Sequence, residues 1–316
     1  MQVHRNLTSL PKFHHAVVTI GTFDGVHIGH RTILQQLKSE AATVNGETVV
    51  ITFHPHPRKI VGDVPDIKIL TTLEEKFFLI EKEGIDHLVV VPFDEDFSKL
   101  SAEAYIKDFL FEKFHPYTII IGYDHHFGHD RTGNFALLEK YGKALGFFVK
   151  EIPVQLIEAA AISSTRIRKA LLQCDIATAK HLLGYDYFFA GTVITGDQLG
   201  RTIGYPTANI QLAHPDKLVP GDGVYAVHFY YKESAASQSA AIAFKGMMYI
   251  GSRPVVNGKR RVIEVNIFDF NRDIYGATVQ VAILDYIRGD MQLSGLEALQ
   301  QQLAIDKRAV LNVLHD

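Results

Sequence analysis

The sequence has only one cysteine, Cys174, among its 316 residues. One thiol cannot form an intramolecular disulfide, which excludes a small secreted domain stabilised by such bonds. Long apolar runs are also missing, because none approaches the roughly 20 residues that a membrane-spanning helix needs. The first 15 residues are polar and lack the apolar segment of a signal peptide. We therefore expect a cytoplasmic protein without a membrane partner.

An excess of positive charge is absent as well. The 32 lysines and arginines face 35 acidic residues, which gives a formal net charge of -3. This balance argues against nucleic acid or an anionic membrane as the main partner. The composition, 47% hydrophobic and 21% charged, is ordinary for a globular protein, and the length predicts about two domains.

The first half of the chain alternates short apolar runs with longer stretches of helical spacing. The apolar runs are residues 16–20, 48–53, 88–91, 118–121 and 147–153. Strands that read as continuous apolar runs are typical of parallel sheets covered on both faces. The pattern predicts a Rossmann-like α/β domain with a parallel sheet, whose ligands bind at the carboxyl ends of the strands. Thr71 followed by Glu74 predicts a capping box at one helix start.

The second half has a different pattern. Two short helices are predicted after Ile162 and end at Gly184, so we expect domains at residues 1–185 and 186–316. Beyond the boundary, strand-like runs follow one another without helices between them, which predicts an antiparallel β-barrel. Ser294 and Glu297 predict a second capping box, followed by a C-terminal helix that packs on the barrel.

The stretch GTFDGVHIGH, residues 21–30, joins the first apolar run to the first helical pattern. A helix N-terminus offers free N–H groups and partial positive charge, both of which suit a phosphate. His27 and His30 can donate hydrogen bonds to phosphate oxygens, and the three glycines allow close approach of the backbone. The alternative is a glycine-rich turn with incidental histidines. Neither the G-x-G-x-x-G fingerprint nor the lysine-bearing P-loop is present.

In the second half, GTVITGDQLGRTIGYPTANI at 191–210 combines closely spaced glycines with Thr207 and Asn209. Thr and Asn supply oxygen ligands for Mg²⁺, although a glycine-rich hairpin with a polar turn is the alternative. Glu264 lies in the strand pattern RVIEVNIF, where a carboxylate can accept the proton of an attacking alcohol. A merely solvent-facing glutamate is the other interpretation.

Clustered histidines at residues 54–56 and 125–129 raise a third possibility, a transition-metal site. His54, His56, His125, His126 and His129, with Asp124 and Asp130, are suitable ligand types for zinc or iron. However, the sequence has no H-E-x-x-H pair, and one cysteine cannot supply a cysteine ligand set.

Several motifs together resemble one family, the bacterial bifunctional riboflavin kinase/FMN adenylyltransferases, also called FAD synthetases. GTFDGVHIGH resembles the H-x-G-H element of nucleotidyltransferases, and TFHPHP (52–57), IGYDHHFGHDRTG (121–133) and ISSTRIR (162–168) resemble three further family elements. GRTIGYPTAN (200–209), GVYAV (223–227) and RVIEVNIFDFNRDIYG (261–276) resemble elements of riboflavin kinases. The resemblance extends over nearly the whole chain.

The resemblance implies two activities. Residues 1–185 would form the FMN adenylyltransferase domain, and residues 186–316 the riboflavin kinase domain. The implied substrates are riboflavin, FMN and ATP, with Mg²⁺ accompanying ATP and FMN and FAD as products. A single-activity adenylyltransferase whose barrel only binds, and a non-catalytic flavin-binding protein, remain as alternatives.

The resemblance also implies roles for individual residues. In the first domain it implies His27 and His30 as catalytic residues, ATP contacts from Gly21, Phe23, Asp24, Gly29, Ser163, Ser164, Thr165 and Arg168, and FMN contacts from His54, Pro55, His56, Pro57, Asp124, Phe127 and Arg131. In the second it implies Glu264 as the catalytic base, phosphate contacts from Gly196, Gly200, Arg201, Gly204 and Pro206, and metal ligands Thr207 and Asn209. His125 and His126 stand where the family has Phe and Arg, and Tyr249 and Val255 stand where many relatives have Asn and Thr.

Overall fold

A computed structural model describes residues 1–62, 66–122, 125–152, 162–196, 199–231, 242–255 and 258–314. The chain divides into two compact units, Met1–Ser164 and Thr165–Asp316. The helices at 164–183 therefore group almost entirely with the second unit, whereas the expected boundary near residue 185 assigned them to the first. Where the boundary between the two activities lies stays a prediction.

The first unit contains a six-stranded sheet in the order β1-β4-β3-β2-β5-β6. All its neighbouring strands are parallel, which confirms the predicted architecture. The strands are β1 (Gln2–His4), β2 (Val17–Ile20), β3 (Thr48–His54), β4 (His87–Pro92), β5 (Thr118–Gly122) and β6 (Phe148–Ile152). The edge strand β1 was not predicted, because its three residues, QVH, contain no apolar run.

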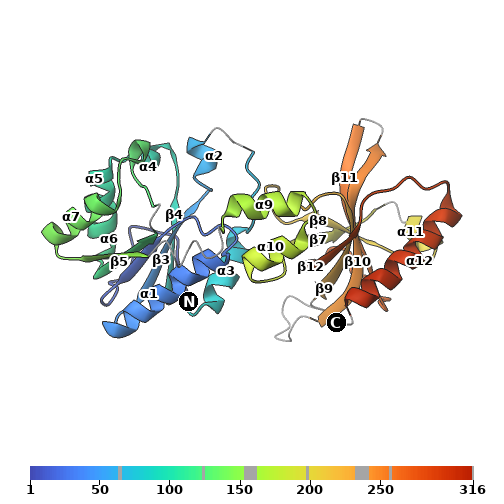
Figure 1. Cartoon of the computed structure of the whole chain (residues 1–316), viewed down its shortest axis with the longest axis horizontal. Helices are drawn as coiled ribbons and strands as arrows, with labels where there is room; N and C mark the ends of the chain where they lie inside the picture. Colours follow the sequence, from blue (N-terminus) through green and yellow to red (C-terminus); the bar gives the residue numbers. More distant parts are fainter. Residues whose placement is uncertain are drawn as a thin grey trace. The chain divides into compact units, whose positions relative to one another are not determined.

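Helices connect these strands (Figure 1). They are α1 (Ile28–Thr43), α2 (Arg58–Val61), α3 (Leu73–Lys82), α4 (Glu95–Ser98), α5 (Ala102–Ala104), the π-helical η1 (Tyr105–Phe111), α6 (Glu112–Phe114), the short 3₁₀ helix η2 (His129–Arg131) and α7 (Phe135–Leu145). Successive residues of a strand point to opposite faces of the sheet. Ile20 and Ile51 share one buried cluster with Phe109 of η1 and Leu138 of α7.

The predicted capping box at Thr71 and Glu74 is one residue out of register. The helix α3 is capped by Thr72, whose hydroxyl accepts from the Glu75 N–H while the Glu75 carboxylate accepts from the Thr72 N–H. The Thr71 hydroxyl has another use, because it accepts the N–H of Gly25 at 3.0 Å. A tertiary contact that the sequence does not show therefore decides which threonine caps the helix.

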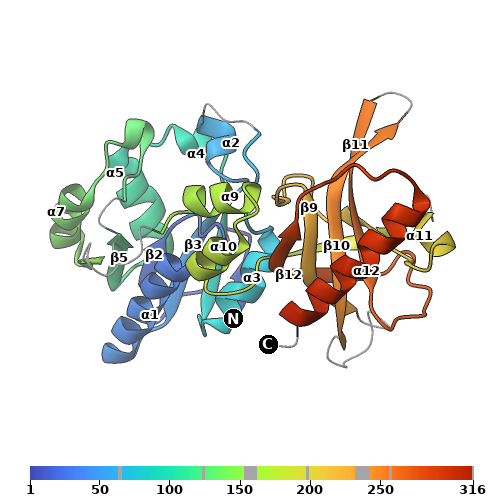
Figure 2. The ribbon, with the colours of Figure 1, turned by 45° about the vertical axis from the view of Figure 1, so that its right-hand side comes forward.

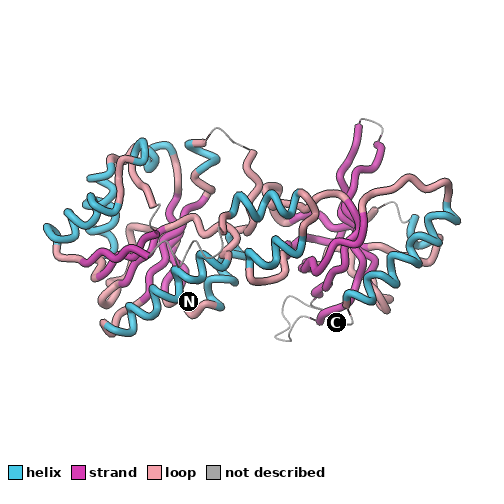
Figure 3. The backbone as a smooth tube through the Cα atoms, in the orientation of Figure 1, coloured by secondary structure: helices cyan, strands magenta, loops and turns pink. Residues whose placement is uncertain are grey.

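The second unit begins with the two predicted helices, α9 (Ser164–Leu172) and α10 (Ile176–Leu183), and Gly184 ends α10 in a left-handed conformation. A closed antiparallel barrel follows, in the order β10-β11-β8-β7-β12-β9. Its strands are β7 (Phe188–Ile194), β8 (Ala208–Leu212), β9 (Gly223–Tyr231), β10 (Ile242–Val255), β11 (Gly258–Ile267) and β12 (Thr278–Arg288), and the helix α11 (Leu199–Thr202) lies between β7 and β8. Figure 3 shows the change from alternating elements to a unit dominated by strands. The predicted barrel is confirmed.

The last helix, α12 (Leu296–Val313), packs against the outside of β9, β10 and β12 (Figure 2). The capping box predicted at Ser294 and Glu297 is wrong. Gly295, with φ of 149°, occupies the N-cap position and provides no side-chain oxygen, so the helix begins one residue later than the pattern indicates. At this start of the helix Leu296 is 55% exposed, whereas Val310 near its end is fully buried.

A buried ion pair fixes α12 to the barrel. Arg288 at the end of β12 donates to both carboxylate oxygens of Asp306, with N···O distances of 2.8 and 2.7 Å, and Gln302 donates a third bond at 2.8 Å. Asp306 is 1% exposed. Because such a carboxylate is cut off from water, removing its charge leaves the Arg288 guanidinium without compensation.

We therefore expect Asp306→Asn to destabilise the barrel by about 3 kcal/mol. Urea denaturation followed by far-UV circular dichroism measures the change. Glu297→Gln, which neutralises an exposed carboxylate on the same helix, is the matched control and should shift the transition by less than about 0.5 kcal/mol. Equal shifts for the two variants would contradict a stabilising role of the ion pair.

Candidate functional site

The first candidate site lies where β2 ends and α1 begins. His27 is the N-cap residue of α1, and its Nδ1 accepts the backbone N–H of His30 at 3.3 Å. Gly29 leaves room for this arrangement, because a Cβ there would lie 3.3 Å from Nδ1 of His27. The structure thus brings the two predicted histidines to the N-terminus of a helix of 16 residues, where partial positive charge favours an anion.

The two imidazoles are stacked. Their ring centroids are 3.7 Å apart with an interplanar angle of 14°, and the Phe23 ring lies 5.0 Å from that of His30. Nδ1 of His30 is buried and has no hydrogen-bond partner among the described residues. Burial, followed by the proximity of His27 and Lys76, holds the pKa of His30 well below its usual value of 6.5. The neutral imidazole therefore keeps a ring nitrogen without a hydrogen-bond partner among the described residues.

Asp24 holds the loop that carries these groups. Its buried carboxylate accepts the backbone N–H of Leu70 at 2.9 Å and that of Thr71 at 3.1 Å, directly before α3. The Asp24 carbonyl accepts the Ser164 hydroxyl at 2.9 Å. The sequence resemblance implies that Asp24 and Ser164 contact ATP. In the structure, the hydrogen bonds of both residues stabilise the loop. Their direct contact with ATP stays a prediction.

The other predicted residues of the ATP site have different surroundings. Gly21 continues the β2 ladder by donating its N–H to Ile51 at 3.0 Å. Ser163 is exposed at the end of the first unit, and Thr165 and Arg168 belong to α9 in the second unit. Their role in binding ATP stays a prediction.

Lys76 is a residue of this site that sequence reasoning missed. It is 7% exposed, and its Nζ donates to the Thr22 carbonyl at 2.7 Å and to the Thr52 hydroxyl at 3.1 Å. Burial lowers its pKa to about 8, although the nearby Asp24 carboxylate acts in the opposite direction. The available signal was a charged residue on the apolar face of α3, four residues before the buried Ile80.

The predicted FMN segment 54–57 follows the carboxyl end of β3. The His54 backbone accepts the N–H of Phe93 at 3.0 Å, and Nδ1 of His56 accepts the N–H of Arg58 at 3.2 Å. The peptide bond between His54 and Pro55 is cis, and Pro57 directly precedes α2. The segment therefore lies at the same edge of the sheet as the stacked histidines.

The second predicted FMN segment contains Asp124, Phe127 and Arg131, and these residues differ in their surroundings. Asp124 lies outside the described residues. Phe127 is 6% exposed and stacks on Tyr105 of η1, so its ring supports the segment from the hydrophobic core. Arg131 is exposed. Whether Phe127 and Arg131 contact FMN stays a prediction.

The histidines of this segment do not converge in the described structure. His126 is exposed, His125 lies beside Phe127, and His129 pairs with Asp130 at 3.1 Å. Within the described ranges, no group of three or more His, Cys, Asp or Glu side chains is arranged to hold a metal ion.

The second candidate site lies on the barrel. In the antiparallel ladder of β8 and β11, Asn209 is directly opposite Glu264, so the two side chains project from the same face. Glu264 is 8% exposed, which excludes a merely solvent-facing glutamate. Thr207 is half-buried and lies two residues before Asn209. The structure therefore brings together the predicted base and the predicted metal ligands.

Glycine is required beside Asn209. A Cβ at Gly196 would overlap the Asn209 side chain, and one at Gly200 would overlap the Tyr205 carbonyl. The next turn, around Gly204 and Pro206, is held by Asn266, whose carboxamide donates to the Pro206 carbonyl at 2.7 Å. Arg201 is exposed on α11. Asn266, two residues after Glu264, is a second contributor that the predicted site did not include.

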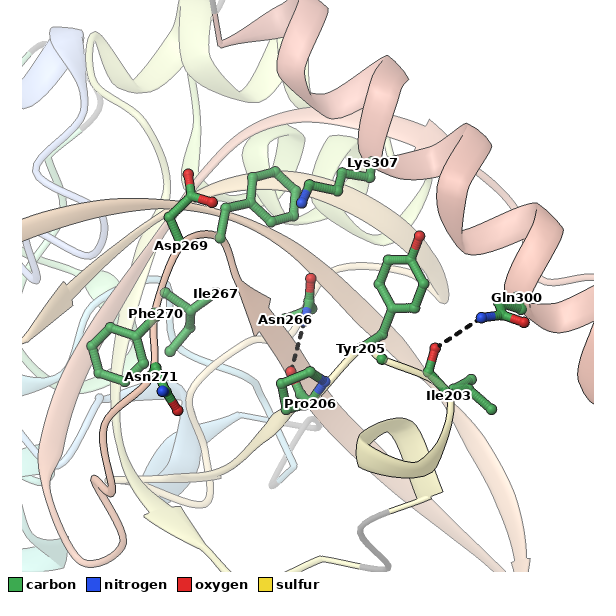
Figure 4. A pocket seen from close by; sticks show the side chains of 12 residues that line it. Ile203, Tyr205, Pro206, Asn266, Ile267, Asp269, Phe270, Asn271, Gln300 and Lys307 are labelled. Atoms are coloured by element: carbon green, nitrogen blue, oxygen red, sulfur yellow. Dashed lines mark hydrogen bonds between the residues drawn. The ribbon is translucent and has the colours of Figure 1, made fainter.

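A cavity of about 530 Å³ adjoins this turn (Figure 4). Tyr205, Pro206, Asn266 and Phe268 line it from the barrel, and α12 contributes Gln300 and Lys307. Gln300 donates to the Ile203 carbonyl at 3.4 Å, and the Lys307 ammonium lies 5.0 Å from the centre of the Phe268 ring.

The two positions that differ from the family pattern are only partly described. Tyr249 is directly opposite Glu264 in the ladder of β10 and β11, on the side away from β8. The backbone of Val255 ends β10, and its side chain lies outside the description.

These features define a nucleotidyltransferase-like α/β unit followed by a barrel with a buried carboxylate beside an asparagine carboxamide. A family model for FAD synthetase matches residues 10–166, and a family model for riboflavin kinase matches residues 183–314. The chain belongs to the family of bifunctional riboflavin kinase/FMN adenylyltransferases.

Individual relatives agree with this assignment. The bifunctional riboflavin kinase/FMN adenylyltransferase of Haemophilus influenzae is 37% identical over 92% of this chain and 91% of its own. That of Escherichia coli is 36% identical over 96% and 93%. A crystal structure described as a macrolide-efflux protein from Streptococcus pneumoniae is 31% identical, covers 98% of both chains and superposes with a TM-score of 0.87. In the described part of the present chain, no helix has the length and apolar character needed to cross a membrane.

The buried position of His30 leads to a prediction about its protonation. The side chain should be neutral at pH 7 and titrate with a midpoint below 6.5. Because the folded-state pKa is lowered, the stability contributed by the neutral ring is present above pH 6.5 and is lost as pH falls through the lowered pKa. NMR of protein labelled in its histidines measures the midpoint, and His30→Gln identifies the signal. A midpoint at or above 6.5 would contradict the burial argument.

Proposed function

We propose that the barrel unit transfers the γ-phosphoryl group of ATP to riboflavin and that the α/β unit then transfers AMP from a second ATP to the resulting FMN. The products are FMN and then FAD with pyrophosphate. The observation that carries this assignment is the pairing of Glu264 with Asn209 in the barrel, separate from the stacked His27 and His30 in the first unit.

In the barrel, Glu264 accepts the proton of the riboflavin hydroxyl as it attacks phosphorus. Its position opposite Asn209 suits this role, because a general base must lie beside the group that reacts. Asn209 and Thr207 provide carboxamide and hydroxyl oxygens, which are the hard ligands that Mg²⁺ prefers. When bound with ATP, Mg²⁺ neutralises phosphate charge. Gly196, Gly200 and Gly204 allow the backbone to approach those phosphates.

In the α/β unit, His27 and His30 stabilise the charge that develops on the α-phosphate during adenylyl transfer. The unpartnered Nδ1 of His30 and the first turn of α1 supply the donors, once the ring tautomer carries its proton there. The segment His54–Pro57, at the same edge of the sheet, contacts FMN.

Single substitutions should separate the two reactions. We expect Glu264→Gln to reduce FMN formation from riboflavin about 100-fold or more, because the general base is lost. FAD formation from supplied FMN should remain near the wild-type rate. His30→Ala should have the opposite effect, with a loss of about 100-fold in FAD formation.

Chromatographic product analysis after incubation with ATP, Mg²⁺ and either flavin measures both rates. Each variant serves as the folding control for the other. If either substitution abolished both activities in a folded protein, the two-site assignment would be wrong.

The cavity beside Pro206 suits the nucleoside part of the ATP used by the kinase. Tyr205 and Phe268 offer aromatic faces, and the neighbouring residues Thr207 and Asn209 are the proposed ligands of the metal–phosphate group. Loss of one stacking ring corresponds to roughly 1.4 kcal/mol, or about tenfold in affinity.

We therefore expect Tyr205→Ala to raise the ATP KM of FMN formation about tenfold while the riboflavin KM changes little. Steady-state kinetics with each substrate varied in turn measures both constants. Tyr275→Ala, which removes a 44% exposed tyrosine outside the cavity lining, is the control. A change confined to the riboflavin KM would assign the cavity to the flavin.

A further inference from the structure

Lys76 has no place in the reaction as described so far, although it is a buried cation beside the adenylyl-transfer residues. It lies in the second turn of α3, 7% exposed, on the side of the helix that faces the sheet. Burying an ammonium group is costly unless hydrogen bonds replace its hydration, and an apolar side chain would pack at this position at lower cost. The position of the charge therefore requires an explanation beyond packing.

The partners of Lys76 come from two different segments. The Thr22 carbonyl, 2.7 Å from Nζ, belongs to the loop that continues through Phe23 and Asp24 to the stacked histidines. The Thr52 hydroxyl, 3.1 Å from Nζ, belongs to β3, two residues before the proposed FMN segment begins at His54. One ammonium group thus contacts both segments that carry the substrate-binding residues.

The hydrogen bonds within this group of three have defined directions. The Thr52 hydroxyl donates to the Thr22 carbonyl at 3.1 Å and accepts from Lys76, while Lys76 also donates to the same carbonyl. We call Lys76, Thr22 and Thr52 the Lys76 network. Each bond lies within ordinary hydrogen-bond distance, and Thr52 is fully buried, so water does not substitute for the missing partner when one is removed.

The same helix holds the loop at a second point. Asp24 bonds to the backbone at Leu70 and Thr71 immediately before α3, and Lys76 bonds to Thr22 one turn later. The loop is therefore fixed on both sides of Phe23. Because misplacement of reacting groups by about 1 Å reduces a rate about 100-fold, the separation of the loop from β3 matters to the reaction.

We propose that Lys76 is a positioning residue for adenylyl transfer, which sets the distance between the ATP loop and the FMN segment by bonding to Thr22 and Thr52 at once. This inference rests on the proposed function of the α/β unit. In this proposal the effect of Lys76 on the rate passes through the two segments that it joins, and not through a contact with substrate.

The first test is the kinetics of FAD formation from FMN by the full-length Lys76→Met protein, which keeps an unbranched side chain, one heavy atom shorter, and removes all three N–H donors. We expect kcat to fall about 10- to 100-fold, with the KM values for ATP and FMN within about threefold of wild type. FMN formation from riboflavin should be unchanged. Lys82→Met, the same substitution at an exposed position of α3, is the matched control and should leave both activities unchanged.

The second test is a double-substitution cycle with Thr52→Val, which removes the hydroxyl at constant shape. Thr52→Val should lower kcat by a smaller factor, Thr52→Ser should retain the wild-type kcat, and the double variant should lose less than the product of the two single losses, because both residues belong to one network. If Lys76→Met does not fold, as judged by circular dichroism, the contrast between Thr52→Val and Thr52→Ser decides the question.

Several results would overturn the proposal. A raised ATP KM with unchanged kcat would mean that Lys76 binds the nucleotide directly. Independent, multiplicative losses in the double variant would mean that the two residues act separately, and unchanged kcat in Lys76→Met or Thr52→Val would remove the role altogether. Wild-type protein that forms no FAD from FMN would instead overturn the proposed function, and the positioning role with it.

Discussion

The pairing of the Asp24 carboxylate with the backbone ahead of α3 is the constraint on which the first site depends. Phe23 and Val26 on either side of it adopt left-handed backbone conformations, with φ of 48° and 36°. For residues other than glycine such conformations cost roughly 1–3 kcal/mol each and persist only where the surroundings impose them. A buried carboxylate must find donors, and the backbone at Leu70 and Thr71 supplies them. The positions of His27 and His30 therefore depend on Leu70 and Thr71, which follow much later in the chain.

In the barrel, an uncharged side chain fixes the loop beside the predicted site. Asn209 occupies space that only a glycine at 196 leaves open, and Asn266 holds the preceding turn through the Pro206 carbonyl. In both units the predicted catalytic side chains lie on or beside regular elements, while one buried polar group fixes the adjoining loop. The predicted catalytic side chains are thus positioned by other buried polar residues, Asp24 and Asn266, to which no step of the reaction is assigned.

Much of the fold could be predicted because it depends on local periodicity. The runs around Val18, Val50 and Ile120 are almost entirely apolar, which is typical of a parallel sheet covered on both faces, and the change of pattern after Gly184 marked the barrel. Helix starts were less predictable. Thr71 and Thr72 each precede a glutamate by three residues, and only the hydrogen bond from Gly25 to Thr71 shows that Thr72 is the cap. The helix α12 begins one residue later than predicted, because Gly295 takes the N-cap position through its backbone conformation.

The residues of the candidate sites also differ in how well the sequence predicts them. Motifs point to candidate residues such as His30 and Glu264, because their spacing is itself the signal, and their catalytic roles stay predictions. Residues that bond to the backbone have no such signal. Lys76 looks like one more charge in a helix until its partners are known, and the sequence does not show that the Asp24 carboxylate accepts hydrogen bonds from Leu70 and Thr71. Long-range partners of this kind are a property of the folded chain.

The contribution of α12 to the cavity has a consequence for biosynthesis. The ribosome delivers the α/β unit first and every strand of the barrel before Gln300 and Lys307, and nascent domains generally fold in the order in which they emerge. A growing chain therefore has its adenylylating unit complete while one wall of the kinase cavity is still missing. During synthesis, the part of the chain that matches FAD synthetase is therefore folded before the part that matches riboflavin kinase is complete.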